Sequence, residues 1–195
     1  MGKEDRLVQH RDRWQCVWRQ RSQQPHSGGA LIVYAGNTLY RINKDTGETI
    51  QTGTMAGESS FSINSATYAD GMLFVALSNG RVQAFNAETL ESLWVYTDPL
   101  GGQSNCPVTV CDGYVYTGFW NGETKDANYV CLSITDGKPN EKLEAKTATW
   151  RYTKAGGFYW AGAYVSKDFM LLGTDDGETG YTKGHGSILL MDPKT

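Results

Sequence analysis

A unit of short strands and tight turns recurs along most of this chain at intervals of about forty residues. Its clearest copy is residues 70–96. There, Asp70-Gly71 and Asn79-Gly80 separate short runs that are rich in strand-forming residues. Both dipeptides accept the positive φ that tight hairpin turns require. This copy is therefore predicted to be an antiparallel meander.

The spacing between the copies restricts the fold further. Thr46 and Thr89 are 43 residues apart, and the turn residues Asp70 and Asp112 are 42 apart. This period, with several strands in each unit, is typical of β-propeller blades, whereas a helical solenoid needs a 3.6-residue apolar pattern. We predict an all-β fold, a partial β-propeller of about four blades, each an antiparallel four-stranded sheet.

A motif in the clearest copy resembles a known repeat. Ala84, Asn86, Thr89 and Trp94 are spaced as in the pyrroloquinoline-quinone (PQQ) type propeller repeat of the quinoprotein alcohol dehydrogenase-like superfamily. Three weaker copies keep parts of the pattern: Arg41, Asn43, Thr46, Gly47 and Gln51; Cys131, Ser133, Asp136 and Gly137; Leu190, Asp192 and Thr195. The resemblance covers roughly residues 30–195 and implies the fold, but not the cofactor, because many proteins with this repeat bind no quinone.

The same motif has a direct physical reading. An Asn or Asp that precedes Thr-Gly by three residues is turn chemistry, because its side-chain oxygen bonds backbone amides and the glycine adopts a left-handed conformation. The tryptophan that follows buries a large ring between adjacent sheets. Trp94 is accordingly predicted to be structural.

The chain divides unevenly by charge. Residues 1–27 hold six Lys or Arg and three acids, for a net +3, while residues 28–195 hold twelve against eighteen, for −6. We predict that residues 28–195 form the incomplete propeller and that residues 1–27 are an irregular basic segment. This segment is a disordered arm, a docking peptide or the product of a misjudged start or reading frame, of which the last is favoured. It lacks the apolar core of a signal peptide, and no apolar run in the chain is long enough to span a membrane.

The chain ends at Thr195, on the threonine of the repeat. Closed propellers have about four to eight blades of four strands. We therefore expect the sequence to be a fragment of a longer protein. If it is a natural half-propeller, we expect it to complete its ring by dimerising.

Polar and aromatic residues precede the turn of each unit, where the innermost strand of a blade lines the central channel. Asn64 and Asn105 are 41 residues apart, and Asn105 and Trp160 are 55 apart, which matches the spacing of the blades. With Gln103 and Tyr159, they are predicted to meet at one mouth of the channel. Amides and aromatic rings there suit a sugar, a quinone or another polar ligand with flat faces. In the alternative interpretation, the asparagines cap turns and Trp160 fills the core.

The resemblance to PQQ dehydrogenases implies further parts: a calcium ion, a catalytic aspartate, a tryptophan under the quinone and often a disulfide between adjacent cysteines. No Cys-Cys pair occurs here, and Asp175, Asp176 and Glu178 are interpreted as a solvated acidic loop. No catalytic residue, metal or cofactor is therefore predicted, and PQQ and calcium enter only under the dehydrogenase alternative.

The four cysteines, Cys16, Cys106, Cys111 and Cys131, have a poor zinc spacing. We expect Cys111 and Cys131 to be buried free thiols, and a disulfide is the alternative if the protein is exported. The three histidines are scattered along the chain, which disfavours hydrolase triads. A net charge of −3 argues against a nucleic-acid partner.

Two classes of function are consistent with these features. The preferred one is a non-catalytic propeller that binds a carbohydrate or a protein partner at its channel mouth, as a scaffold in an exported bacterial protein. The alternative is a part of a quinone-dependent dehydrogenase. The resemblance implies a periplasmic, cell-surface or extracellular location, although this chain shows no signal peptide.

Overall fold

The computed structural model describes residues 26–27, 29–57, 66–134, 136, 142–143, 145–158, 160, 162–180 and 185–194. This part of the chain contains fifteen strands and no helix. The strands form four antiparallel sheets, each built from consecutive strands. The predicted partial β-propeller is therefore confirmed.

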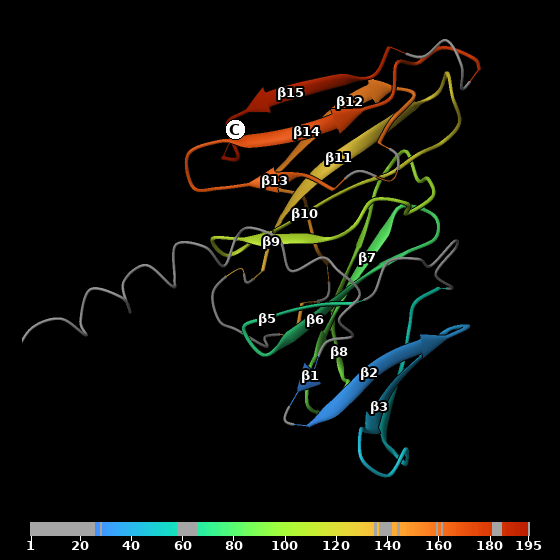
Figure 1. The fold of residues 1–195 in the computed structure, drawn as a ribbon, viewed down its shortest axis with the longest axis vertical. Helices are drawn as coiled ribbons and strands as arrows, with labels where there is room; N and C mark the ends of the chain where they lie inside the picture. The colour runs from blue at the N-terminus through green and yellow to red at the C-terminus, as the bar shows by residue number, and fades with distance from the viewer. Residues whose placement is uncertain are drawn as a thin grey trace, which may run out of the picture.

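Each sheet is one blade, and Figure 1 shows the blades following one another from β1–β4 at one end of the molecule to β13–β15 at the other. Blade 1 comprises β1 (His26–Ser27), β2 (Ala30–Ala35), β3 (Thr38–Asn43) and β4 (Thr49–Thr54). Blade 2 comprises β5 (Thr67–Ala69), β6 (Met72–Leu77), β7 (Arg81–Asn86) and β8 (Ser92–Thr97). Blade 3 comprises β9 (Thr109–Cys111), β10 (Tyr114–Gly118), β11 (Asp126–Ser133) and β12 (Trp150–Ala155). Blade 4 comprises β13 (Tyr164–Val165), β14 (Met170–Thr174) and β15 (Ser187–Met191). Blade 4 thus has three described strands instead of the predicted four.

The β1 strand lies at the end of the predicted basic segment, and residues 1–25 lie outside the described residues. The proposed boundary at residue 28 stays a prediction.

The predicted hairpin turns are present. Asp70 and Gly71 have φ angles of 50° and 75°, and Asn79 and Gly80 have 59° and 68°. Two successive residues with positive φ match the twist of the flanking strands. These dipeptides therefore join β5 to β6 and β6 to β7 as tight turns.

The turn of the repeat motif also has its expected hydrogen bonds. Oδ1 of Asn86 accepts the backbone N–H groups of Glu88 and Thr89 at 2.9 and 3.1 Å. In blade 1, Oδ1 of Asn43 accepts the corresponding amides at 2.9 and 3.1 Å. Leu90 stands where the repeat has glycine and adopts φ 55°, so the backbone keeps the left-handed turn without a glycine.

The blades pack face to face through apolar side chains. We call the sheet face that contacts the next blade along the chain the forward face, and the opposite one the rear face. Three buried clusters fill the interfaces, and they include Ile32, Leu39, Leu73 and Phe85 between blades 1 and 2; Phe74, Val82, Val115 and Leu132 between blades 2 and 3; Tyr116, Tyr129, Met170 and Leu172 between blades 3 and 4.

The segment that connects β11 to β12 covers the outer edge of blade 2. The N–H of Leu143 donates to the carbonyl of Leu93 at 2.9 Å, and Lys146 forms a parallel bridge with Tyr96. The ammonium of Lys146 lies 4.8 Å from the ring centroid of Trp94 and bonds Asp136 at 3.0 Å. An otherwise open strand edge is thereby protected from pairing with another chain.

Trp94 is a core residue, as predicted. Its side chain is 2% exposed, and its ring centroid lies 5.9 Å from that of Phe74. Removing a buried indole costs both its transfer free energy and a cavity. We expect Trp94→Ala to lower the free energy of unfolding by about 3–5 kcal/mol, measured by urea denaturation.

The control for this substitution is Trp160→Ala, at a tryptophan that is 47% exposed. Its cost should stay below about 1 kcal/mol. Equal costs for the two variants would contradict the structural role of Trp94.

Candidate functional site at the start of the inner strands

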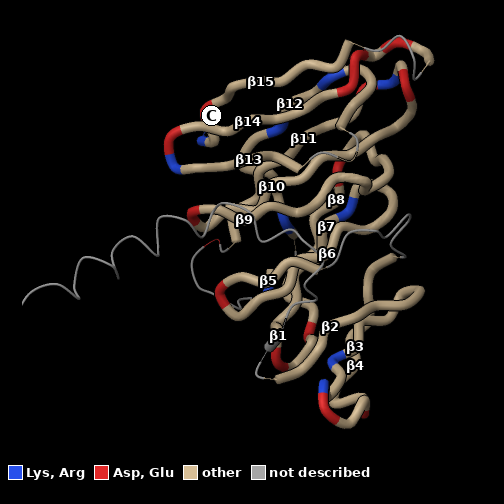
Figure 2. Tube along the Cα trace, in the orientation of Figure 1, with Lys and Arg blue, Asp and Glu red and all other residues tan. Residues whose placement is uncertain are grey.

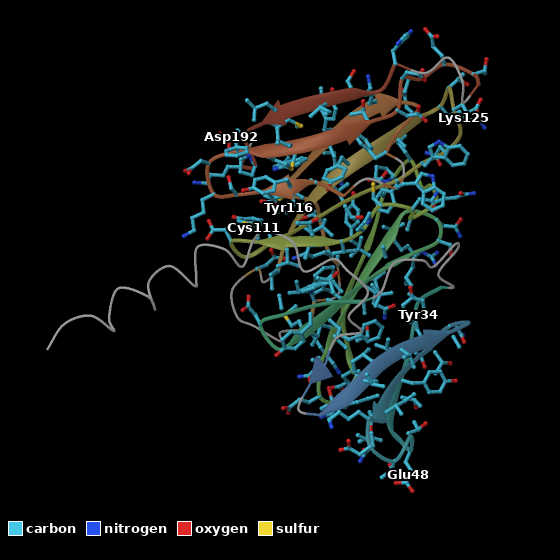
Figure 3. The ribbon with its side chains drawn as sticks, in the orientation of Figure 1. Tyr34, Glu48, Cys111, Tyr116, Lys125 and Asp192 are labelled. Atoms are coloured by element: carbon cyan, nitrogen blue, oxygen red, sulfur yellow. The ribbon has the colours of Figure 1, made fainter. Side chains whose placement is uncertain are left out.

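The residues that the sequence singles out in blade 3 lie just before β9, the first strand of that blade. We call the first strand of each blade its inner strand. The backbone of Gln103 pairs with Trp120 in the β10–β11 loop, through hydrogen bonds of 2.8 and 3.0 Å. Lys125 marks this loop in Figure 3, and Cys111 marks the opposite end of the blade. The candidate site therefore lies at the end of the propeller where the β10–β11 loop meets the crossover from blade 2.

Gln103 and Asn105 lie close together but differ in exposure. Nδ2 of Asn105 donates to Oε1 of Gln103 at 3.4 Å. Asn105 is only 2% exposed, whereas Gln103 is half-buried. Of this pair, Gln103 presents the more accessible side chain, and Asn105 supports it from beneath.

Trp160 occupies the corresponding position before the inner strand of blade 4. Its side chain is 47% exposed, and its φ is 57°. Positive φ is unusual for a residue with a bulky side chain. Asn64 and Tyr159 lie outside the described residues, so the predicted set of five is placed only at Gln103, Asn105 and Trp160, and its role as a ligand site stays a prediction.

A pair of glycines lies in each crossover, the segment that connects one blade to the inner strand of the next. Gly102 has φ 114°, and a Cβ added to it would lie 3.0 Å from the Cβ of Phe119. Gly157 has φ 62°, and a Cβ there would lie 2.7 Å from the carbonyl oxygen of Phe119. Each crossover therefore needs a residue without a side chain at this point.

The sequence interpretation missed these glycines, although a signal was present. Gly101-Gly102 and Gly156-Gly157 are 55 residues apart, the same interval as Asn105 and Trp160. A Gly-Gly pair at a fixed offset from each inner strand would have located both crossovers.

A buried polar network lies beside the first crossover. Asp98 follows β8, and its carboxylate is fully buried. It accepts the hydroxyl of Tyr96 at 2.7 Å and Nδ2 of Asn128 at 2.9 and 3.1 Å. Nε of Arg151 donates to the Tyr96 hydroxyl at 2.9 Å and lies 3.8 Å from Asp98. The network ties the last strand of blade 2 to blade 3, and no motif in the sequence had suggested it.

The electrostatics of this network follow from its burial. Burial raises the pKa of Tyr96, and a hydrogen bond from Arg151 partly offsets the rise. The hydrogen bond to Tyr96 raises the pKa of Arg151. The phenol therefore stays protonated and keeps donating to Asp98 at neutral pH.

Asp98→Ala should remove the acceptor of both Tyr96 and Asn128. The Arg151 side chain is 40% accessible, so water can solvate its charge once the carboxylate is lost. We therefore expect a cost of about 2–4 kcal/mol in the free energy of unfolding, mainly from the unpaired groups of Tyr96 and Asn128. The matched control is Asp45→Ala at the exposed pair with Lys44, which should cost about 0.5 kcal/mol or less. Urea denaturation of both variants tests this, and a cost for Asp98→Ala as small as that of the control would contradict it.

The three described cysteines are buried thiols outside any disulfide, as expected for Cys111 and Cys131. Cys106 lies with them in the core between blades 3 and 4, where Figure 3 labels Cys111 and Tyr116. Burial raises the pKa of the Cys106 and Cys131 thiols to about 12 each. Neither thiol is a nucleophile at neutral pH.

These raised thiol pKa values predict alkaline destabilisation. Their stabilisation is fully present below the pKa of an unfolded thiol, about 8.5, and is lost as the pH rises toward about 12, because the unfolded chain releases protons that the folded chain retains. Stability should fall by roughly 1.4 kcal/mol per pH unit for each thiol. Urea denaturation between pH 8 and 10, under reducing conditions, measures this slope.

Cys106→Ala combined with Cys131→Ala should flatten the slope, whatever the double variant costs at pH 7. The buried tyrosines contribute little below their ordinary pKa of about 10. An unchanged slope in the double variant would show that other groups carry the pH dependence.

The side chains of the acidic loop after β14 accept hydrogen bonds mainly from backbone N–H groups of the same loop. Oδ1 and Oδ2 of Asp176 accept the N–H groups of Glu178 and His185 at 2.9 Å each. These bonds lower the pKa of Asp176. Within the described ranges, no group of three or more His, Cys, Asp or Glu side chains is placed to hold a metal ion. In the same ranges, no helix is long and apolar enough to cross a membrane.

The stacked sheets and their Asn-Thr turns define the chain as a β-propeller of the PQQ type. A family model described as outer membrane protein assembly factor BamB matches residues 9–155. The chain belongs to this family of PQQ-like repeat proteins. The search of curated proteins found no match.

Solved structures share the fold at low sequence identity. Quinohemoprotein alcohol dehydrogenase from Comamonas testosteroni aligns with a TM-score of 0.62 and 18% identity, over 86% of this chain and 32% of its own. BamB from Moraxella catarrhalis aligns at 0.56 and 15%, over 87% of this chain and 47% of its own. The computationally designed Ika4 protein aligns at 0.53 and 12%, over 97% and 98%. The chain thus spans about a third of the dehydrogenase that it resembles.

Proposed function

We propose that this chain is a non-catalytic binding scaffold that holds a protein partner at the start of its inner strands. The observation that carries the proposal is the conformation of Trp160, a 47% exposed aromatic residue held at φ 57°. Backbone strain of this kind persists where the surroundings impose it, and it clusters at functional sites. An exposed indole is also a typical anchor for a protein partner.

Gln103 complements this anchor from the neighbouring blade. Its backbone is fixed by the two hydrogen bonds to Trp120, and its side chain is held by Asn105. An amide offers both a donor and an acceptor, which suits the backbone of an extended peptide. The match to a family model named for an assembly factor supports a protein partner over a carbohydrate.

An exported location is part of the proposal. The support is the family model, which is described as an outer membrane protein assembly factor. We accordingly place the function in the periplasm or at the cell surface of a bacterium.

Binding of extended peptides tests the proposed site directly. A library of extended peptides is titrated into the purified chain while the indole N–H resonance of Trp160 is followed by NMR. We expect some peptides to shift this resonance, and Trp160→Ala and Gln103→Ala to weaken their binding at least tenfold.

Phe169→Ala is the matched control, because Phe169 is 39% exposed in the β13–β14 turn, at the other end of the strands. It should leave peptide affinity unchanged. Binding of oligosaccharides instead of peptides would reassign the ligand class, and binding that survives both site variants would refute this location.

The dehydrogenase alternative is favoured by one observation, the alignment with quinohemoprotein alcohol dehydrogenase at a TM-score of 0.62. That likeness extends over 32% of the enzyme and is a likeness of fold. We propose that the chain alone binds neither PQQ nor calcium. Isothermal titration with PQQ in the presence of Ca²⁺ tests this, and saturable binding would favour the enzyme alternative.

A further inference from the structure

Blade 4 presents an apolar sheet face at one end of the stack (Figure 1). Leu171 pairs with Leu190, and Gly173 pairs with Ile188, which places these side chains on the forward face. Leu171, Ile188 and Leu190 are 39%, 80% and 72% exposed. They are among the most exposed large apolar side chains in the described part of the protein.

The equivalent positions in the preceding blades are buried. In blade 2, Phe74 pairs with Ala84, and Ala76 pairs with Val82. Phe74, Ala84 and Val82 are each 0% exposed, because the rear face of blade 3 covers them. In blade 3, the pair of Tyr116 and Cys131 is equally buried against blade 4. A forward face in this fold is therefore built to be covered by a rear face.

The strands of the blade 4 face also lack charge. Neither β14 nor β15 contains a Lys, Arg, Asp or Glu residue, and both are drawn without charged positions in Figure 2. Charged side chains on a sheet face oppose its association, whereas an exposed apolar patch marks an interaction surface. The blade 4 face carries no such protection.

A complementary rear face lies at the other end of the stack, on blade 1. Leu31 pairs with Ile42, and Val33 pairs with Tyr40, on the face that points away from blade 2. These four side chains are only partly buried. Their equivalents in blade 3 include Val115 and Leu132, which are 0% exposed beneath blade 2.

We propose that two copies of this chain associate head to tail, with the forward face of blade 4 in each copy packed on the rear face of blade 1 in the other. Each copy contributes one face of each kind, so a two-fold pair forms the contact twice and leaves neither face exposed. A head-to-tail contact of this kind closes into a ring when its rotation allows it. The pair has twice four sheets, within the usual range of about four to eight blades.

The inference rests on the two faces and does not depend on a ligand at Trp160.

The test is the mass of the purified chain in solution, measured by light scattering after size exclusion and by sedimentation at several concentrations. One chain is 21.5 kDa, so two copies give about 43 kDa. Ile188→Glu combined with Leu190→Glu should shift the mass to that of one chain. Both positions are exposed in the single chain, so the variant should keep the circular dichroism spectrum of a folded sheet protein.

Two further variants sharpen the result. Leu100→Glu introduces one glutamate at a leucine that is 44% exposed outside this face, and it should leave the mass at two copies. Tyr40→Lys, on the rear face, should dissociate the pair. A mixture of the Tyr40→Lys chain with the Ile188→Glu, Leu190→Glu chain should restore it, because one contact is then unaltered and the other joins lysine to glutamate.

A wild-type chain that stays at 21.5 kDa up to about 100 μM would overturn the proposal and assign the face to a different partner or to a further blade. A pair that survives the glutamate variants would overturn it as well. Assemblies that keep growing with concentration would show an open head-to-tail array instead of a closed pair. Peptide binding at Trp160 is measured separately, so either proposal can fail without the other.

Discussion

The packing of each sheet against the next one along the chain is the interaction on which this structure depends. All six residues of β6 are buried, since blade 2 has a neighbour on either side. In β14 and β15 burial alternates along the strand, since only one face is covered. A strand in the middle of the stack is thus buried on both faces, whereas a strand of blade 4 is buried on one face only. The proposed pairing of two copies follows from this difference.

Around the apolar interfaces, polar contacts set how one blade meets the next. The carboxylate of Asp98 accepts hydrogen bonds from Tyr96 of blade 2 and Asn128 of blade 3. The paired glycines allow each crossover to pack closely against Phe119. Glycine allows this close approach, and the buried network fixes its direction. Gln103 follows directly after the first glycine pair, and Trp160 lies three residues after the second, so the position of both residues depends on these crossovers.

Much of the fold could be predicted because its signals are local. The hairpin dipeptides and the Asn-Thr turns act through φ angles and hydrogen bonds within a few residues, so Asp70-Gly71 and Asn86 were read correctly from the sequence. The segment that covers the edge of β8 could not be read in this way. Its contact between Leu143 and Leu93 joins residues 50 positions apart and uses backbone groups, which leave no mark on residue type. The glycine pairs had a readable signal that the interpretation of the inner strands overlooked.

The sequence by itself determined the class of fold, the turns and the structural role of Trp94, because each of these depends on near neighbours or on a repeated pattern. Only the tertiary structure decided which side chains of the candidate site reach solvent. It buried Asn105 and left Trp160 exposed. It also brought Asp98 from the loop after β8 together with Asn128 of β11 and Arg151 of β12. The physical reason is that exposure depends on what packs against a residue, and the packing partners in a propeller come from the next blade, about forty residues away.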